Sequence, residues 1–513
     1  MTISRRTLLS YLAELAAASP EKKLLGGPDG WLEAGRLLTL VNRAGAAFRR
    51  LGLGAGDTVA FRATRRPESA VLILGLRAAG AVAALCDPKQ DLGETLNGAD
   101  TPVPVRALIQ PGGGTAFQMV WPVEERKKPV KLDLSALSPE GAGEDIPSVS
   151  STDPAFVIFT SGSTGKSKAV VLSESNLVNN LIDSQPLGDY RPEDRALGAL
   201  PLHHVFGLVL LAGAAVLGYG VYYPEKTDVP AILSAIQAQR LTRMNGVPSL
   251  YLAMADQRGG YDLSSMRAGF IGGGPVTAEQ FARIEETLGM TLISVYGMSE
   301  FVGISCASAL DSREIRASGV GRFYSMNAGK ILREDGTEAA PGETGEICAL
   351  GPARMVGYLG RPMAPDEWLP TGDLGYLDEG GVLHLTGRKK DIIIRNGNNL
   401  SPRKIEQALL TVPGVRAAAV VGLPDDRQGE APAAMVAADR DDLPLDDALP
   451  KNERPVLYLF VDALPLTASG KPDRRAIRET LLRLWRQDCP RAQSNAKKRL
   501  DNGVDLTNNR SRT

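Results

Sequence analysis

Cysteine and histidine are scarce in this sequence. Its 513 residues include four cysteines and three histidines, and Cys86, Cys306, Cys348 and Cys489 lie far apart along the chain. Zinc sites and dithiol redox motifs place two cysteines within a few residues of each other. The sequence therefore predicts neither kind of site, and we expect the thiols to be reduced and structural, as in a cytoplasmic protein.

The sequence also lacks a net charge of either sign and lacks long apolar runs. The 58 basic and 59 acidic side chains leave a net charge of −1, which argues against broad attraction to nucleic acid or to an anionic membrane. No uninterrupted apolar stretch reaches the roughly 20 residues that cross a bilayer. We expect no nucleic-acid partner, no membrane span and a cytoplasmic location.

The N-terminal segment has paired arginines, Arg5 and Arg6, like those of a twin-arginine export signal. Such a signal continues with an uncharged apolar stretch, but here Glu14 interrupts the stretch. Leu8 and Leu12 instead share one helical face with the neighbouring leucines. The segment is therefore predicted to be a surface helix.

Helical and strand patterns alternate through the first half of the chain. Residues 37–51 are amphipathic, 57–61 and 81–85 are short apolar runs, and 68–79 has a helical pattern. This alternation is typical of an α/β domain with parallel strands. Few elements can be placed within residues 86–150, which are rich in proline, glycine and charge.

Composition changes suggest three parts of the chain. A charged stretch at 387–391 resembles a linker, and the pattern beyond it predicts a smaller α/β domain. The final residues are poor in apolar groups and are expected to be disordered. We therefore divide the chain into an N-terminal core domain, 1–387, a C-terminal domain, 388–487, and a tail, 488–513.

A loop rich in glycine and hydroxyl groups follows the apolar run at 156–159. It contains Thr160, Ser161, Gly162, Ser163, Thr164 and Gly165, and Lys166 and Lys168 come directly after it. Glycines let backbone N–H groups turn toward phosphate oxygens, and the hydroxyls and lysines add donors and charge. A P-loop NTPase needs four residues between its glycine and the Gly-Lys pair. Here there are only two, so that alternative fails.

Five further motifs follow in order, at 200–207, 272–275, 295–300, 370–373 and 464–475. Together with the loop at 156–168, they resemble the motifs of the adenylate-forming superfamily. This superfamily comprises acyl- and aryl-CoA ligases, peptide-synthetase adenylation domains and luciferases, and the motif style here is most similar to stand-alone acyl- or aryl-CoA ligases. The resemblance implies an α/β fold with a large N-terminal domain of packed α/β subdomains and a small, mobile α+β C-terminal lid.

The resemblance also implies ATP and Mg²⁺ as cofactors and assigns roles to residues. Lys471, His204 and Glu300 would be catalytic, Thr164 and Glu300 would bind the metal, and Lys390 would be the hinge of the lid. A positioned cation such as Lys471 suits the negative charge that develops when a carboxylate attacks the α-phosphate. The residues that would bind the nucleotide are Thr160, Ser161, Gly162, Ser163, Thr164, Gly165, Lys168, Gly273, Gly274, Pro275, Tyr296, Gly297, Ser299, Asp373 and Arg388.

The substrate implied by the resemblance is a small carboxylic acid. The motif at 200–207 lacks the aspartate that amino-acid-activating domains usually place there, and an unpaired ammonium would be costly to bury. An aryl or fatty acid therefore fits better than an α-amino acid. The residues expected to line the acid pocket are His204, Val205, Phe206, Leu208, Asn245, Gly246, Val247, Val302 and Gly303.

The acyl acceptor and the assembly stay open at this point. Gly397 stands where the superfamily lines its thiol tunnel, which favours transfer to CoA or to phosphopantetheine on a separate acyl carrier protein. We expect a monomer or a homodimer. Three alternatives remain: an enzyme that loads a β-amino acid on a carrier protein, a luciferase-like oxidative enzyme, and a weakly active or non-catalytic homologue. The last arises because the segments 86–150 and 437–455 are short for the superfamily.

Overall fold

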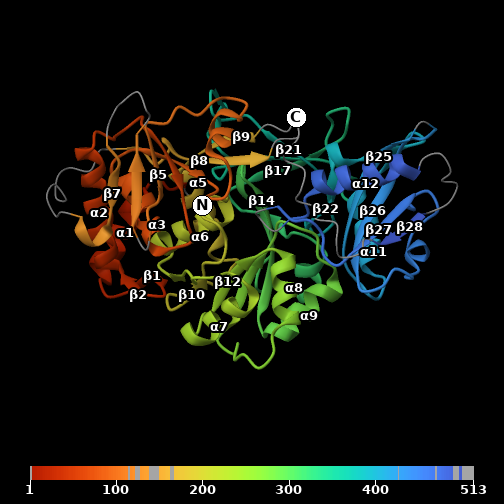
Figure 1. Ribbon diagram of the computed structural model, residues 1–513, viewed down its shortest axis with the longest axis horizontal. Coiled ribbons are helices and arrows are strands. Elements are labelled where there is room, and N and C mark those ends of the chain that lie inside the picture. The colour runs from red at the N-terminus through yellow and green to blue at the C-terminus, as the bar shows by residue number, and fades with distance from the viewer. Residues whose placement is uncertain are drawn as a thin grey trace. The chain divides into compact units, whose positions relative to one another are not determined.

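The computed structural model describes residues 3–113, 116–121, 128–137, 149–161, 167–425, 427–467, 471–488 and 496–499 (Figure 1). The chain forms two compact units. The first contains residues 1–273, 282–329 and 349–369, and the second contains 274–281, 330–348 and 370–513. The predicted boundary at residue 387 lies within the second unit, and the division of the chain there remains a prediction.

Two nine-stranded sheets form the frame of the first unit. One has the order β16-β15-β14-β13-β12-β10-β11-β1-β2 and is parallel from β14 to β1. Its strands are β1 (Lys23–Gly27), β2 (Gly30–Glu33), β10 (Arg195–Leu197), β11 (Gly220–Tyr222), β12 (Arg243–Gly246), β13 (Ala268–Ile271), β14 (Thr291–Met298), β15 (Phe301–Cys306) and β16 (Arg322–Phe323).

The other sheet has the order β20-β19-β9-β8-β4-β3-β5-β6-β7, with parallel pairing from β8 through β4 and β3 to β5. Its strands are β3 (Thr58–Arg62), β4 (Val82–Cys86), β5 (Ala107–Pro111), β6 (Phe117–Val120), β7 (Val130–Leu132), β8 (Pro154–Ser161), β9 (Ser167–Ser173), β19 (Gly357–Tyr358) and β20 (Arg361–Pro362). The predicted α/β domain with parallel strands is confirmed. Strands β5, β6 and β7, helix α4 (Leu92–Asn97) and a 3₁₀ helix at Leu134–Ala136 lie in the segment 86–150, where few elements could be placed from the sequence.

Ten helices have described bounds before residue 320. They are α1 (Leu8–Ala18), α2 (Ala34–Arg50), α3 (Pro67–Ala78), α4 (Leu92–Asn97), α5 (Glu174–Ser184), α6 (Val205–Val216), α7 (Val229–Gln239), α8 (Pro248–Asp256), α9 (Ala278–Leu288) and α10 (Arg313–Ser318). Within the described part of the chain, no helix combines the length and apolar character needed to cross a bilayer.

Small residues set the packing of α2 against α3. A Cβ atom on Gly45 would lie 2.7 Å from the Cβ of Ala78, and one on Gly75 would lie 2.6 Å from the Cβ of Ala44. Real Cβ atoms do not approach this closely, so glycine is required at both contacts. Helix α3 is buried along almost its whole length, as expected for a crossover helix that joins two parallel strands.

The predicted N-terminal helix is confirmed as α1. Thr7 caps its first turn by accepting a hydrogen bond from the Ser10 N–H. Leu8 and Leu12 are buried, and the Leu8 N–H donates to the buried carboxylate of Glu174 over 2.6 Å. Burial of the apolar face and this polar contact together fix the segment on the first unit.

A four-stranded sheet, β17-β18-β21-β22, belongs mostly to the second unit. Its strands are β17 (Ala328–Leu332), β18 (Gly345–Leu350), β21 (Leu369–Leu377) and β22 (Leu383–Arg388). The stretch read from sequence as a linker, 387–391, comprises the end of β22 and a short 3₁₀ helix at Lys389–Asp391.

The C-terminal part of the second unit is a sheet with a helix on each face (Figure 1). Alternate side chains of one strand point to opposite faces, so Val436 packs with Ile405 of α11, and Met435 packs with Ile477 of α12. The elements are β23 (Ile393–Arg395), β24 (Asn398–Leu400), α11 (Pro402–Leu410), β25 (Val415–Asp425), β26 (Gly429–Ala438), β27 (Leu457–Val461), α12 (Arg474–Asp488) and β28 (Ala496–Arg499).

Two segments of this part bear on expectations from the sequence. Residues 439–456 contain a short 3₁₀ helix at Leu445–Ala448 and join β26 to its parallel partner β27. Within the tail expected to be disordered, Ala496–Arg499 form β28, which pairs in parallel with β27. The other tail residues after Asp488 lie outside the described part of the chain.

Candidate active site

The glycine-rich loop connects two antiparallel strands, β8 and β9. Their register pairs Thr160 with Lys168 and Ser161 with Ser167, so the two ends of the loop lie side by side. The apolar run at 156–159 lies in β8, so the loop directly follows a strand. The loop residues Gly162, Ser163, Thr164 and Gly165 lie outside the described residues. Lys168 is half-buried, and its Nζ lies 4.8 Å from the ring centroid of Tyr358.

The motif at 295–300 forms the end of β14 and the tight turn into β15. Tyr296 and Glu300 are buried, with 7% and 8% of their surfaces exposed. A Cβ atom on Gly297 would lie 2.5 Å from the carbonyl oxygen of Val302, so this turn needs glycine. Ser299 is half-buried next to Glu300. The turn thus holds a nearly buried carboxylate at a fixed place.

Glu300 has one hydrogen-bond partner that the sequence did not reveal. The hydroxyl of Tyr358 donates to Glu300 Oε1 over 3.0 Å. Burial, followed by the nearby Glu300 charge, raises the pKa of Tyr358 far above its ordinary value of 10, so the tyrosine is a permanent donor. The dipeptide Gly357-Tyr358 carries no signal of this contact, because it depends on which strand pairs with β9.

A magnesium ion held with ATP fits this arrangement. Among the described residues, no three histidine, cysteine or acidic side chains gather into a group that could hold a metal. Mg²⁺ commonly takes one or two carboxylates together with phosphate oxygens and water. The lone buried carboxylate of Glu300 suits that pattern. The second predicted metal ligand, Thr164, lies outside the described residues.

The motif at 200–207 leads into α6, with His204 at the position before its first residue. The rings of His203 and His204 lie 4.4 Å apart, and Asp87 Oδ2 lies 3.8 Å from His203 Nε2. Burial, followed by the neighbouring His204, lowers the pKa of His203 to about 4. His203 is therefore neutral at pH 7. The Asp87 contact joins loops from the two large sheets, which sequence alone does not indicate.

The predicted acid-pocket residues all lie in the first unit. Val205, Phe206 and Leu208 belong to the first turn of α6, Asn245 and Gly246 end β12, Val247 precedes α8, and Val302 and Gly303 lie in β15. A side chain on Gly303 would collide with Asn180 and Tyr324, so glycine is required there for packing. The assignment of these residues to the acid remains a prediction.

The segment 272–275 follows β13. Gly273 has a φ angle of +83°, which only glycine adopts readily. A Cβ atom on Gly272 would lie 2.7 Å from the carbonyl oxygen of Val295, so glycine is also required at position 272. Gly274 and Pro275 are half-buried. That Gly273, Gly274 and Pro275 bind the nucleotide remains a prediction.

Asp373 and Arg388 meet in the second unit. They are directly paired residues of the antiparallel strands β21 and β22, and Arg388 Nε lies 2.8 Å from Asp373 Oδ1. Asp373 is buried, whereas half of the Arg388 side chain is exposed. Thr371 orients the turn by accepting a hydrogen bond from the Asp373 N–H. The structure thus brings together two of the residues predicted to bind the nucleotide.

Lys390 lies in the short 3₁₀ helix after β22 and is exposed. Its neighbours are anchored: Lys389 lies 2.8 Å from Glu346, and Asp391 lies 3.8 Å from Arg474. Lys390 therefore occupies an exposed position between two held residues. Its role as a hinge remains a prediction.

Lys471 is exposed, at the base of a loop that is closed on itself. The Thr467 N–H donates to the Lys471 carbonyl over 2.8 Å, and the Lys471 N–H donates to Thr467 Oγ1 over 3.3 Å. The Asp473 N–H also donates to the carbonyl of Pro465. These bonds fix the backbone of Lys471, while residues 468–470 lie outside the described part.

Arg474 connects this loop to the body of the C-terminal sheet. Its Nη2 lies 2.7 and 2.9 Å from the two carboxylate oxygens of Glu406, and its Nη1 donates to the carbonyl of Val420. Glu406 is 2% exposed. Burial raises the pKa of Glu406, and the Arg474 charge opposes that rise. The loop that carries Lys471 is therefore attached to a buried ion pair.

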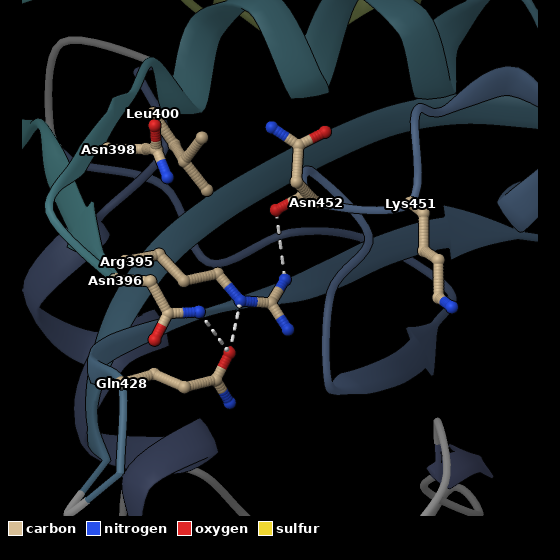
Figure 2. Close-up of a pocket in the computed structure, with 7 residues that line it drawn as sticks. All are labelled: Arg395, Asn396, Asn398, Leu400, Gln428, Lys451 and Asn452. Atoms are coloured by element: carbon tan, nitrogen blue, oxygen red, sulfur yellow. Dashed lines mark hydrogen bonds between the residues drawn. The ribbon is translucent and has the colours of Figure 1, made fainter.

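Gly397 lies in the turn between β23 and β24. Asn396 and Gly397 have φ angles of +50° and +76°, as in the two-residue type I′ turn that Asn-Gly favours. A pocket of about 330 Å³ lies beside this hairpin (Figure 2). Arg395 crosses it and donates to Gln428 Oε1 over 2.6 Å. The lining residues are Arg395, Asn396, Asn398, Leu400, Gln428, Lys451 and Asn452.

Comparison with known proteins identifies the family. Residues 12–359 match the AMP-binding enzyme family, and residues 404–471 match the AMP-binding enzyme C-terminal domain. The chain is 31% identical to sulfoacetate–CoA ligase of Cupriavidus necator, over 91% of this chain and 96% of that protein. It is 32% identical to feruloyl-CoA synthase of Amycolatopsis sp., over 90% and 96% of the two chains.

A solved structure agrees with these matches. The structure of o-succinylbenzoate coenzyme A synthetase from Bacillus subtilis, in complex with ATP and magnesium ion, superposes with a TM-score of 0.77 at 27% identity. The alignment covers 92% of this chain and 99% of that one. Both domains of the family are thus present, as a large N-terminal and a small C-terminal domain. The chain belongs to the AMP-binding enzyme family, and with it to the adenylate-forming superfamily that its motifs resemble.

Proposed function

We propose that this protein activates a carboxylic acid other than an α-amino acid as an acyl-adenylate, and then transfers the acyl group to the thiol of CoA. The observation that carries the proposal is the contact chain from Lys168 through Tyr358 to the buried Glu300. These contacts connect Lys168, a cation suited to binding phosphate, with Glu300, a carboxylate suited to binding magnesium, and all three residues lie in the first unit.

In the first half-reaction, a carboxylate oxygen of the acid forms a bond to the α-phosphorus of ATP. The bond from that phosphorus to the bridging oxygen breaks, and pyrophosphate leaves. Lys168 and the hydroxyl-rich loop would bind the departing phosphates, and the Asp373 carboxylate would accept hydrogen bonds from the ribose hydroxyls. Lys471 would stabilise the charge that develops where two anions meet. Magnesium, when bound at Glu300, would neutralise phosphate charge.

In the second half-reaction, the thiol sulfur attacks the acyl carbon, AMP leaves, and the thiol proton passes to solvent. The lid would turn about Lys390 between the two steps, which separates two chemistries at one site. The closed loop at Lys471 and its attachment through Arg474 support movement of the loop together with its domain.

CoA is the acceptor that we favour over a carrier protein. Among the described residues, the pocket beside Gly397 is lined by two cations, Arg395 and Lys451, and by no carboxylate, which suits a ligand rich in phosphate. The names of the curated relatives, a CoA ligase and a CoA synthase, support the same choice. A carrier-protein phosphopantetheine remains the alternative.

For the acid, the relatives' names support a non-amino acid with an aryl ring or a second anionic group. A β-amino acid, a luciferase-like oxidation and a weakly active or non-catalytic homologue are the competing hypotheses. The motif at 200–207 contributes no carboxylate to pair with an ammonium, which counts against α-amino acids. The expected cytoplasmic location and the monomeric or homodimeric state remain predictions.

Acid-dependent exchange of labelled pyrophosphate into ATP tests the proposal. The panel would contain sulfoacetate, ferulate, o-succinylbenzoate, a medium-chain fatty acid, an α-amino acid and β-alanine. Exchange with one of the first four supports the proposal, and exchange with β-alanine alone would favour the carrier-loading hypothesis. Loss of exchange with every acid would refute the enzyme claim.

Lys471→Ala separates the two half-reactions. We expect it to suppress the pyrophosphate exchange by at least about 100-fold, since a positioned charge of this kind contributes several kcal/mol. Thioester formation from preformed acyl-adenylate should be largely unchanged. Equal loss of both steps would contradict the assigned role, and Lys451→Ala serves as a control lysine that is expected to leave adenylation intact.

A further inference from the structure

Tyr358 touches both charged groups that the proposed nucleotide site needs. Its hydroxyl donates to Glu300 Oε1 over 3.0 Å, and its ring lies 4.8 Å from Lys168 Nζ. Lys168 and Glu300 are 132 residues apart in the sequence and lie on different sheets. Within the described part of the chain, these contacts of Tyr358 link the two charges.

The strand pairing explains how one tyrosine reaches both groups. Tyr358 is directly opposite Val170 in the antiparallel pair of β19 and β9. Lys168 is two residues before Val170, so it is the diagonal neighbour of Tyr358 on the same face, within reach of long and aromatic side chains. The sheet register therefore places the ammonium group of Lys168 over the ring of Tyr358.

Backbone bonds hold Tyr358 in place on both sides. The Val356 N–H donates to the Val171 carbonyl, and the Leu359 N–H donates to the Ala169 carbonyl, each over 2.9 Å. The backbone of Glu300 is tied to the same segment, because the Met355 N–H donates to the Glu300 carbonyl over 2.9 Å.

Position 357, next to the tyrosine, requires glycine because the backbone of β20 approaches it closely. A Cβ atom on Gly357 would lie 2.6 Å from Pro362 Cα in the returning strand β20. The hairpin of β19 and β20 can therefore form only with glycine next to the tyrosine. The segment that presents Tyr358 is rigid at the backbone as well as at the side chain.

The hydrogen bond from Tyr358 stabilises and orients the Glu300 carboxylate, and this bears on metal binding. A nearly buried carboxylate without partners is unstable, and a hydrogen bond to a charged group contributes more than a neutral one. The bond engages Oε1 and so fixes the rotation of the carboxylate. A metal ion then meets a group whose orientation is already set, and it does not have to order that group on binding.

We propose that Tyr358 is a positioning residue that holds Glu300 in the orientation that binds magnesium and holds Lys168 in the orientation that binds ATP phosphates. The inference rests on the proposed function. The two parts of the side chain have separate roles. The hydroxyl orients the carboxylate that would bind the metal, and the ring orients Lys168 through the attraction of a cation to an aromatic face.

Two substitutions separate these jobs. Tyr358→Phe keeps the ring and removes the hydroxyl, whereas Tyr358→Leu removes both. Tyr261→Phe, on a loop between α8 and β13, is the matched control. Binding of an ATP analogue with a methylene between the α and β phosphorus atoms is measured by calorimetry without divalent metal. Binding of Mn²⁺ to the protein–analogue complex is then measured by electron paramagnetic resonance.

For Tyr358→Phe we expect Mn²⁺ affinity to fall about tenfold, as for loss of one hydrogen bond to a charged group. Metal-free binding of the analogue should stay within about twofold of the wild type. Tyr358→Leu should also lower metal-free binding by about two- to fivefold, the range for an exposed cation–π contact. Circular dichroism melts of all variants verify that they fold.

The outcomes are distinct. If Tyr358→Phe binds Mn²⁺ as tightly as the wild type does, the positioning role is refuted while the proposed function stands. Equal loss of metal-free and metal-dependent binding in Tyr358→Phe also refutes it, because a general structural defect would act in that way. If the wild-type protein binds neither the analogue nor Mn²⁺, the proposed function fails and the positioning role fails with it.

Discussion

The ion pair between Arg474 and Glu406 allows a quantitative prediction about the C-terminal domain. Replacing Arg474 by methionine keeps most of the aliphatic stem and removes the guanidinium. The carboxylate of Glu406 then keeps the hydrogen bond from the Val420 N–H, over 2.8 Å, and the weaker influence of the Arg403 charge. Because Glu406 is 2% exposed, water cannot replace the lost partner, and the variant should be less stable.

The expected loss has an upper limit that depends on pH. A buried carboxyl group can avoid its unpaired charge by binding a proton, and for an ordinary pKa of 4.5 this costs about 3.4 kcal/mol at pH 7 and about 0.7 kcal/mol at pH 5. The lost hydrogen bonds add about 1 kcal/mol. We therefore expect Arg474→Met to destabilise the domain by roughly 3–4 kcal/mol at pH 7.

The sign of the pH dependence follows from linkage. Burial already raises the pKa of Glu406 above 4.5 in the wild type, and removing the opposing Arg474 charge should raise it further in the variant. Between 4.5 and this higher folded-state value the folded state holds a proton that the unfolded state has released, so stability is lost as the pH rises. The difference from the wild type should therefore shrink to about 1–2 kcal/mol at pH 5.

Urea unfolding followed by the fluorescence of Trp485 measures this effect. Trp485 lies in α12, and its indole N–H donates to the carbonyl of Pro424, so it reports on the same domain. The other three tryptophans are replaced by phenylalanine in every protein compared. Arg475→Met is the control, because the pair of Arg475 with Glu479 is largely exposed and should contribute less than about 1 kcal/mol.

Two results would refute the reasoning. A destabilisation that is equal at pH 5 and pH 7 would show that loss of packing, and not the unpaired carboxylate, causes it. A destabilisation as small as that of Arg475→Met would show that Glu406 does not need its partner. Adding Glu406→Gln to the Arg474→Met variant should abolish the pH dependence.

Three further predictions concern the site. Asp373→Asn should weaken ATP binding at least about tenfold but leave the affinity for 2′,3′-dideoxy-ATP unchanged, because that analogue lacks the hydroxyls that Asp373 is predicted to accept; equal losses would contradict the ribose role. Lys451→Ala should raise the KM for CoA about three- to tenfold without changing pyrophosphate exchange; an unchanged KM would remove the pocket beside Gly397 from the acceptor site. His203 has a folded pKa of about 4 against 6.5 unfolded, so the wild type should lose about 2 kcal/mol of stability between pH 7 and pH 5 as the unfolded chain gains a proton, and a smaller loss for His203→Gln in urea melts would verify this.

The sequence could predict the family and the fold class, and it supplied most of the candidate residues of the site. Short-range patterns were sufficient for this, because motifs such as 295–300 and 370–373 each lie within one strand and its turn. The apolar run at 156–159, which lies in β8, was recognised for the same reason. Periodicity and glycine positions are local properties that a linear reading detects.

Only the tertiary structure decided which side chains support that site. Tyr358, His203 and Arg474 act through contacts with partners 58, 116 and 68 residues away. Such contacts follow from sheet order and strand register, and neither leaves a periodic signal in the sequence. The sequence thus determined the chemistry that the protein carries, because reacting groups occur in compact motifs. The fold determined how rigidly that chemistry is held, because rigidity comes from long-range packing.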